Sequence, residues 1–305
     1  MALLYTDPSI DRPFSIAQEV TADYTISIGS NGQGGGKFPV FDPWSNAWRR
    51  IEVSGSGLNQ DIRSASVDGG AVEDMSTTRR GQWFYVYGTL SAQDRPALYF
   101  SIKPPMLSPS LLTYVINNNG TADNTKTILL IFRIGQDGKC GPYFGNDGPR
   151  SMIWWPNCGT PIGFSGYDHT LTYTLAPTRD ANGNPAPNTT PQELYLNTPG
   201  DLRFSFLIAP SNFPVLELNG YAYNTISGKR SMLFFALTDM NGNRLGPMSN
   251  SVAIAGLGGS PQGVHCSLKP GMPAGQYCAA PFGWTPDLDS GPSYFALKTD
   301  GQFIV

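Results

Sequence analysis

The sequence predicts an all-β fold with two antiparallel β-sandwich or jelly-roll-like domains, long loops and an extended C-terminal segment. Short runs rich in Val, Ile, Thr, Tyr, Phe and Trp recur along the chain between Gly, Pro, Asn and Asp, a pattern typical of strands separated by turns. The 35 Gly and 26 Pro make up a fifth of the 305 residues, and this content disfavours helices. No amphipathic helix pattern longer than two turns occurs.

The strongest strand signals also predict the domain boundaries. In residues 170–175 threonines alternate with larger side chains, as in a strand with one buried face. We predict an N-terminal β domain at 1–136, a Gly-, Pro- and Cys-bearing connector at 137–169, a second β-sandwich domain at 170–256 and an extended segment at 257–305. Strands are expected at 24–28, 83–90, 97–102, 127–134, 170–175, 202–208, 231–237, 251–255 and 293–297.

Two turns share the form Asp-x-Asn-Gly-Asn, at 180–184 and 239–243. Asn-Gly favours a type I′ hairpin turn, because both residues accept positive φ. The same residues match the first ligands of a calcium-binding loop, but its sixth position must be Gly, and this chain has Pro185 and Arg244 there. Hairpin turns therefore explain both segments, and we expect no metal site.

Charge is sparse and evenly balanced. Charged residues are 14% of the chain and the net charge is −3, against about 25% charged residues in typical domains. Such a surface favours permanent contacts in an oligomer, or alternatively a secreted β domain with a neutral polar surface. The absence of a basic run argues against nucleic-acid binding.

The sequence also predicts where the chain resides. The longest apolar run, 128–132, is too short to cross a bilayer, and residues 1–8 lack the pattern of a secretion signal. We therefore expect no membrane insertion, and a chain made in the cytoplasm.

Known catalytic patterns fail at identifiable positions. The two histidines, His169 and His265, offer few acid–base options, and no G-x-S-x-G sequence is present. The Gly-rich run at 32–37 is followed by Phe38 and Pro39, where a phosphate loop needs Ser or Thr and a helix. We expect no enzymatic activity and no cofactor. A hydrolase with paired carboxylates remains an alternative, because carboxylate separation cannot be read from sequence.

The four cysteines lack the C-x-x-C spacing of zinc sites. A Gly- and Pro-rich loop separates Cys140 from Cys158, and another separates Cys266 from Cys278, which suits two local disulfides. Buried free thiols are the alternative, because no secretion signal accompanies them. Oxidation after the protein is released from the cytoplasm in a particle would explain how disulfides could form without a secretion signal.

Three tryptophans are candidate binding residues. Trp154 and Trp155 lie in a predicted loop, and Trp284 lies near the C-terminus. Exposed aromatic rings form platforms for sugar rings, whereas rings packed beneath the loop would be structural.

One region resembles a known family. The sequences W-F-Y-V-Y-G-T-L at 83–90, A-L-Y-F-S-I-K-P-P at 97–105 and F-R-I-G at 132–135 are similar to a β domain of tailed-bacteriophage fibre and decoration proteins. The similarity covers residues 57–136. Separately, residues 236–252 resemble the last hairpin of a fibronectin-type or immunoglobulin-like sandwich.

The resemblance implies a structural virion protein: a fibre, baseplate or capsid-decoration component of a tailed phage, made in the host cytoplasm. We expect a homo-oligomer, specifically a trimer, with other virion proteins and host surface glycan as further partners. The loops at 140–165 and 176–192 are the expected contact regions. The alternative function is a carbohydrate-binding β-sandwich module.

Overall fold

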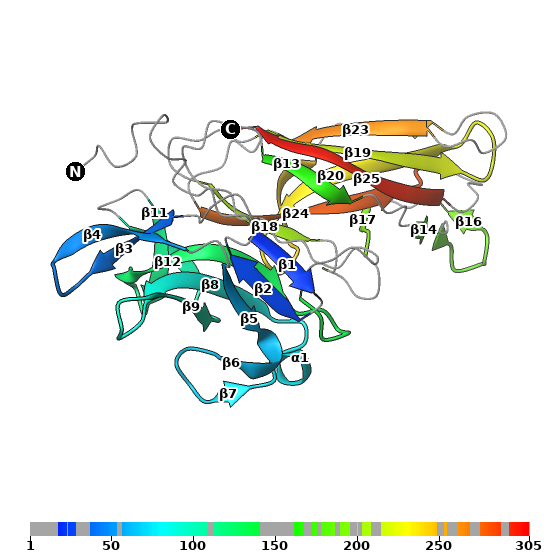
Figure 1. The fold of residues 1–305 in the computed structure, drawn as a ribbon. Helices are drawn as coiled ribbons and strands as arrows, with labels where there is room; N and C mark the ends of the chain where they lie inside the picture. Colours follow the sequence, from blue (N-terminus) through cyan, green and yellow to red (C-terminus); the bar gives the residue numbers. More distant parts are fainter. Residues whose placement is uncertain are drawn as a thin grey trace.

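The computed structural model confirms the all-β prediction, with antiparallel sheets throughout the described residues (Figure 1). The only helical elements described are η2 (Ile62–Ser64) and α1 (Met75–Thr78). The described residues fall into an N-terminal part, 18–140, and a C-terminal part, 162–304. The structure describes residues 18–22, 24–28, 37–53, 57–108, 113–140, 162–167, 173–175, 178–186, 190–195, 200, 203–208, 215–248, 253–254, 262–268, 275–287 and 293–304.

The N-terminal part is built around a five-stranded antiparallel sheet in the order β10-β11-β12-β8-β9. Its strands are β8 (Trp83–Leu90), β9 (Pro96–Ser101), β10 (Pro105–Ser108), β11 (Thr113–Asn118) and β12 (Thr121–Arg133). Three smaller sheets accompany it: β1 (Gln18–Ala22), β2 (Thr25–Ile28) and β5 (Leu58–Asp61); β3 (Lys37–Asp42) and β4 (Ala47–Glu52); β6 (Ala65–Ser66) and β7 (Val72–Glu73).

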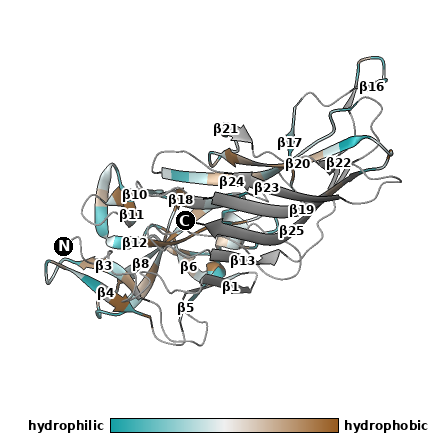
Figure 2. Cartoon of the chain, turned by 90° about the horizontal axis from the view of Figure 1, so that it is seen from above, coloured by the Kyte–Doolittle hydropathy of each residue, from teal (hydrophilic) through white to brown (hydrophobic). Residues whose placement is uncertain are grey.

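Strand β8 is buried on both of its faces, which explains its continuous apolar sequence. On one face Phe84 stacks on Phe132 with ring centroids 5.5 Å apart. Further along this face a Cβ at Gly88 would come 2.4 Å from the Phe38 ring of β3, so only glycine fits there. On the other face Tyr85 points toward the C-terminal part. By contrast, hydrophilic and hydrophobic residues share the shorter strand β4 (Figure 2).

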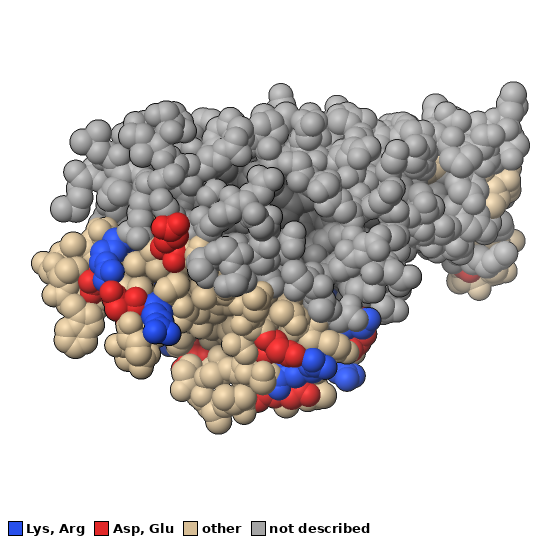
Figure 3. All heavy atoms as spheres, in the orientation of Figure 1, with Lys and Arg blue, Asp and Glu red and all other residues tan. Residues whose placement is uncertain are grey.

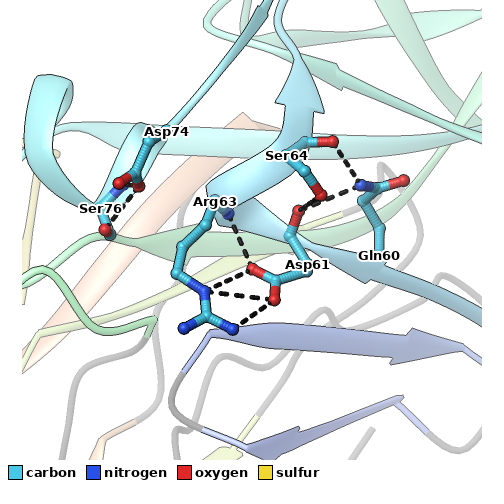
Figure 4. A network of polar contacts seen from close by, with 6 residues as sticks. All are labelled: Gln60, Asp61, Arg63, Ser64, Asp74 and Ser76. Carbon is cyan, nitrogen blue, oxygen red and sulfur yellow. Dashed lines mark hydrogen bonds and ion pairs between the residues drawn. The ribbon is translucent and has the colours of Figure 1, made fainter.

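Short polar contacts fix the segment between β5 and β8 (Figure 4). Asp61 begins η2 by accepting a hydrogen bond from the Arg63 backbone N–H at 2.8 Å, and its carboxylate also pairs with the Arg63 guanidinium. Asp74 begins α1 in the same way, accepting from the Ser76 N–H at 3.0 Å. Both are N-cap interactions, which satisfy amide groups that a short helix leaves unpaired.

The C-terminal part consists of two facing sheets, since β20 contacts β19, β23 and β25 of the other sheet. One sheet has the order β13-β25-β19-β23, with β14 on β25; the other has the order β17-β24-β20-β21, with β18 on β24 and β22 on β20. The strands are β13 (Ile162–Tyr167), β14 (Tyr173–Leu175), β17 (Gln192–Glu193), β18 (Phe204–Ile208), β19 (Val215–Asn224), β20 (Arg230–Thr238), β21 (Arg244–Met248), β22 (Ala253–Ile254), β23 (Gln262–Leu268), β24 (Gly275–Trp284) and β25 (Ser293–Ile304). A separate hairpin pairs β15 (Thr178–Arg179) with β16 (Pro185–Ala186).

The division of the chain differs from the predicted one in two places. Residues 257–305, expected as an extended segment, contain β23, β24 and β25, which pair within both sheets of the C-terminal part. Strand β13 lies inside the expected connector and pairs with β25. Each of these strands contains Gly, and β24 also contains Pro281, which hides the strand pattern. Neighbouring strands supply the pairing that the local sequence does not show.

The two parts contact each other through the central sheet. The Tyr85 hydroxyl donates a hydrogen bond to Gln276 Oε1 of β24 at 3.2 Å, and burial raises the pKa of Tyr85 to about 12. Leu207 of β18 is fully buried in the same hydrophobic cluster as β8 and β12. The N-terminal core therefore continues into the C-terminal part.

The two Asp-x-Asn-Gly-Asn turns have the same geometry, which is not the predicted type I′. In each turn the Gly N–H donates to the Asp carbonyl and the Asp N–H donates to the last Asn carbonyl. Only the glycines, Gly183 and Gly242, have positive φ, at 81° and 90°. This is a type I turn followed by a glycine bulge, the common three-residue hairpin loop. In each turn the Asp carboxylate accepts hydrogen bonds from two backbone N–H groups. These bonds stabilise the turn while the Asn residue keeps a negative φ.

A nearly buried ion pair fixes the second turn in place. Arg203 donates from Nε and Nη2 to the two Glu193 carboxylate oxygens at 2.7 and 2.6 Å, and the side chains are 10% and 13% exposed. Arg203 Nη1 also donates to the Met240 carbonyl at 3.4 Å. One guanidinium thus connects β17, the start of β18 and the turn at 239–243.

Candidate functional site

The candidate site is a groove of about 650 Å³ on the N-terminal part. It lies between the turn that joins β3 to β4 and the turn that joins β8 to β9, with residues of β9 and β12 also lining it. Its lining residues are Val40, Phe41, Asp42, Pro43, Trp44, Arg49, Thr89, Leu90, Ser91, Ala92, Asp94, Tyr99, Thr125 and Lys126.

Asp42 builds the turn that forms one wall of the groove. Its carboxylate accepts hydrogen bonds from the Trp44 N–H at 2.9 Å and the Ser45 hydroxyl at 2.8 Å. The Ser45 hydrogen bond is the largest cause that lowers the pKa of Asp42, so the carboxylate is charged at neutral pH. Asn46 completes the turn with a φ of 50°, a conformation that Asn tolerates. The consequence is that Trp44 stands at the tip with 95% of its surface exposed.

Arg49 connects the two walls. It donates to Asp42 at 3.1 Å and, through Nη1 and Nη2, to both carboxylate oxygens of Asp94 at 2.7 and 3.0 Å. The Asp94 hydrogen bond is the largest cause that raises the pKa of Arg49. A two-pronged contact of this kind fixes direction as well as distance, so the two turns are held at a set separation.

The remaining side of the groove is aromatic and cationic. Lys126 Nζ lies 5.1 Å from the centre of the Tyr99 ring, a cation–π distance, and 2.7 Å from Asp123. Although desolvation opposes ionisation of Asp123, hydrogen bonds from Lys126 and Thr125 together outweigh it and lower the pKa of this carboxyl. Phe41 packs edge-on against Trp48 with centroids 5.5 Å apart. The groove thus combines ring faces with fully paired charges.

Charges of both signs lie side by side on the described surface in Figure 3, rather than gathering by sign. The groove follows this pattern, since Arg49 and Lys126 are matched by Asp42, Asp94 and Asp123. Its chemistry is therefore that of hydrogen-bond donors and acceptors beside aromatic rings, with little net charge.

Of the three tryptophans predicted to form a sugar-binding platform, the structure describes only Trp284. This side chain is half-buried in the C-terminal part, where its ring lies 6.2 Å from Phe234 and, like Met232, packs against the hydrophobic cluster that contains Phe234. Trp154 and Trp155 lie outside the described residues. The exposed tryptophan that the structure does describe is Trp44. Its signal in the sequence is Asp42-Pro43-Trp44-Ser45-Asn46, where turn residues surround an indole between two short strands.

The cysteines lie in two separate places. Cys140 is buried in the N-terminal core, and its predicted partner Cys158 lies outside the described residues. Cys278 is a buried thiol whose Sγ lies 3.2 Å from Met240 Sδ, so the predicted bond to Cys266 is not formed. Cys266 lies opposite Leu218 in one sheet, whereas Cys278 lies opposite Thr238 in the other. Burial raises the pKa of Cys278 to about 12.

The other residues considered for metal or acid–base chemistry are dispersed. His265 lies on β23 opposite Asn219, and His169 is outside the described residues. Asp180 and Asp239 each accept hydrogen bonds from their own turn, as the hairpin interpretation predicts. Within the described ranges no three His, Cys, Asp or Glu side chains gather as metal ligands. In the same ranges no helix has the length and apolarity to cross a membrane.

Comparisons with known proteins give matches among solved structures alone. A scan against protein-family models finds no match, and a search of curated proteins finds none. A chain from the viral particle of infectious bursal disease virus is 11% identical, over 93% of this chain and 70% of its own length, with a TM-score of 0.22. A chain of the Gx strain of the same virus is 10% identical, over 95% and 80% of the two chains, with a TM-score of 0.20.

Both of these chains come from infectious bursal disease virus, and neither is a tailed-phage protein. A third, from a subviral particle of the same virus, is 10% identical over 95% and 76% of the two chains, with a TM-score of 0.20. TM-scores of this size do not establish a shared fold. The predicted resemblance to tailed-phage proteins therefore gains no support from them.

Proposed function

We propose that this chain is a structural protein of a virus particle and acts through its surfaces rather than by catalysis. The observation that carries the proposal concerns the segments similar to virion proteins. They lie up to about fifty residues apart in the sequence, yet they form the neighbouring strands β9, β8 and the end of β12. The sequence similarity therefore corresponds to one contiguous piece of sheet.

The construction of that sheet supports a scaffolding role. Strands β8 and β12 are buried on both faces, so the central sheet holds layers together on either side. The described surface carries apolar side chains that a partner can cover. The large ones are Trp44, Val72, Ile102, Tyr195 and Ile226. Sparse charge favours such contacts, because fewer ions need to be desolvated.

On the segment resemblance alone, we further propose that the chain is a fibre, baseplate or capsid-decoration component of a tailed phage. It would assemble as a homotrimer from chains made in the host cytoplasm. Other virion proteins and host surface glycan are its proposed partners, and the loops at 140–165 and 176–192 are the proposed contact regions.

The solution mass of the full chain tests the proposal. Light scattering behind size-exclusion chromatography is expected to give three times the chain mass of 33.0 kDa, independent of loading concentration. A different fixed multiple keeps the structural role and excludes the trimer. A single-chain mass at every concentration, up to about 1 mM, contradicts an assembly-based function.

A further inference from the structure

We propose that the groove between the β3–β4 and β8–β9 turns binds a neutral saccharide, with Trp44 as the ring-stacking residue. The inference does not depend on the virion role, since a saccharide site is defined by the groove itself. It places sugar binding at residues other than the predicted Trp154, Trp155 and Trp284.

The size and position of the groove fit a small ligand. Its volume of about 650 Å³ falls within the range of about 300–1,000 Å³ that is usual for small-molecule sites. Two turns form its walls, and the Arg49 guanidinium holds them together through Asp42 and Asp94. The walls are therefore fixed before a ligand arrives, which reduces the ordering cost of binding.

The aromatic residues favour a ligand with one apolar face and a polar rim. Trp44 is 95% exposed at a turn whose backbone N–H is held by Asp42. Tyr99 lines the same groove with a partly buried ring that the Lys126 ammonium covers, so it adds apolar surface at the edge of the site. A sugar ring has C–H faces that stack on such rings and hydroxyls around its edge that form hydrogen bonds.

The polar groups favour a neutral ligand over an ionic one. Each charged side chain that lines the groove already has a partner of opposite sign. A carboxylate has about four acceptor positions, and each Asp94 oxygen accepts one described bond from Arg49. Asp94 is also 61% exposed. It can accept from sugar hydroxyls without losing the ion pair, whereas a charged ligand would have to compete for Arg49 or Lys126.

Binding of the full chain to an array of neutral and acidic oligosaccharides provides the first measurement. The neutral probes are maltotriose, cellotriose, chitotriose and galactosyl oligomers; the acidic probes are sialylated and uronic-acid oligomers. We expect binding to at least one neutral probe, confirmed by calorimetry. Absence of neutral binding up to about 10 mM ligand, or binding of acidic probes alone, overturns the inference.

Substitutions locate the site. Trp44→Ala is expected to weaken affinity about tenfold or more by removing a stacking surface, whereas Trp44→Phe retains part of it. Tyr195→Ala is the matched control, because Tyr195 is an exposed aromatic that does not line the groove. Unchanged affinity in Trp44→Ala overturns the proposed site.

Solution mass separates this inference from the proposed function. If Trp44→Ala changes the oligomeric mass and leaves sugar binding intact, Trp44 is a protein contact and the saccharide site is wrong. If the chain is monomeric and still binds a neutral sugar through Trp44, the saccharide site holds and the assembly function fails.

Discussion

Two arginines connect a hairpin turn to a neighbouring segment, one in each part of the molecule, and only one of them leaves an open groove. Arg49 joins the β3–β4 turn to Asp94 with 39% of its side chain exposed. Arg203 joins the turn at 239–243 to Glu193 with 10% of its side chain exposed. The same ionic group therefore serves an exposed site in one part and a packed joint in the other.

The difference lies in what occupies the space beside each arginine. Next to Arg203, Met240 Sδ is 3.2 Å from both Gln276 Nε2 and Cys278 Sγ. The Met240 side chain of the turn therefore occupies the space beside the arginine. Next to Arg49, the turn instead directs Trp44 outward and leaves about 650 Å³ open. The packing of the adjacent turn, rather than the ion pair itself, therefore determines whether a groove is left open.

Removing the buried arginine is expected to have the largest effect. Arg203→Ala leaves Glu193 charged and nearly buried, so the free energy of unfolding should fall by about 3–5 kcal/mol. Urea denaturation monitored by tryptophan fluorescence measures it. Replacing Arg203 and Glu193 together with Met and Leu should cost much less. A loss below about 1 kcal/mol in Arg203→Ala would show that the joint is not structural.

The two Asp-x-Asn-Gly-Asn turns each contain a glycine at the same position, so the two glycines can be compared directly. A Cβ at Gly242 would come 2.0 Å from Arg203 Nη2, whereas nothing lies within 4 Å at Gly183. Both have positive φ, so Gly→Ala adds similar backbone strain at each. Gly242→Ala should therefore destabilise by about 1–3 kcal/mol more than Gly183→Ala. Equal urea midpoints for the two variants would contradict the packed position of the second turn.

The carboxylates of the two turns make a pH-dependent comparison. Although desolvation opposes ionisation of Asp239, hydrogen bonds from Asn243 and the turn outweigh it and lower its pKa below the usual 3.8. Its stabilising contribution is therefore complete above about pH 4 and is lost as pH falls through the lower folded value. Asp239→Asn should flatten the fall of unfolding free energy in acid. Hydrogen bonds from its own turn, first that from the Asn184 N–H, also lower the pKa of Asp180, but solvent weakens them because this carboxylate is exposed. Asp180→Asn should therefore flatten the profile less than Asp239→Asn; equal flattening in the two variants would contradict the distinction.

The smallest effect is expected at the exposed arginine. Arg49→Ala should move the urea midpoint little, because its ion pair with Asp94 is exposed and the buried Asp42 carboxylate keeps its hydrogen bonds from Trp44 and Ser45. It should weaken sugar binding, because the walls of the groove are no longer held together. A clear loss of stability without a change in sugar affinity would reverse the roles assigned to the two arginines.

The sequence correctly predicted elements that depend on a short stretch of the chain. Strand β8 covers residues 83–90 as expected, because its apolar run and flanking turns suffice to define it. The turns at 180–184 and 239–243 were correctly located, but their type was wrong because the Asp carboxylate changes the backbone geometry that Asn-Gly alone favours.

Features that depend on distant residues were not predicted. Strand β24 contains Gly275, Pro281 and Gly283, and its strand pairing comes from β18 and β20. The groove depends on the contact between Arg49 and Asp94, which lie 45 positions apart in the sequence. Its one local signal was an indole inside a turn at Trp44.

The most direct test of the proposed saccharide site is a titration observed at the indole N–H groups of the chain. The full chain, labelled with nitrogen-15, is titrated with maltotriose, cellotriose and chitotriose, and the Trp44 resonance is assigned with Trp44→Phe. The account predicts that the Trp44 indole resonance moves with saturating dependence on at least one sugar, while that of the packed Trp284 does not. A Trp44 resonance unchanged by every sugar, or a shift at Trp284 alone, would contradict it.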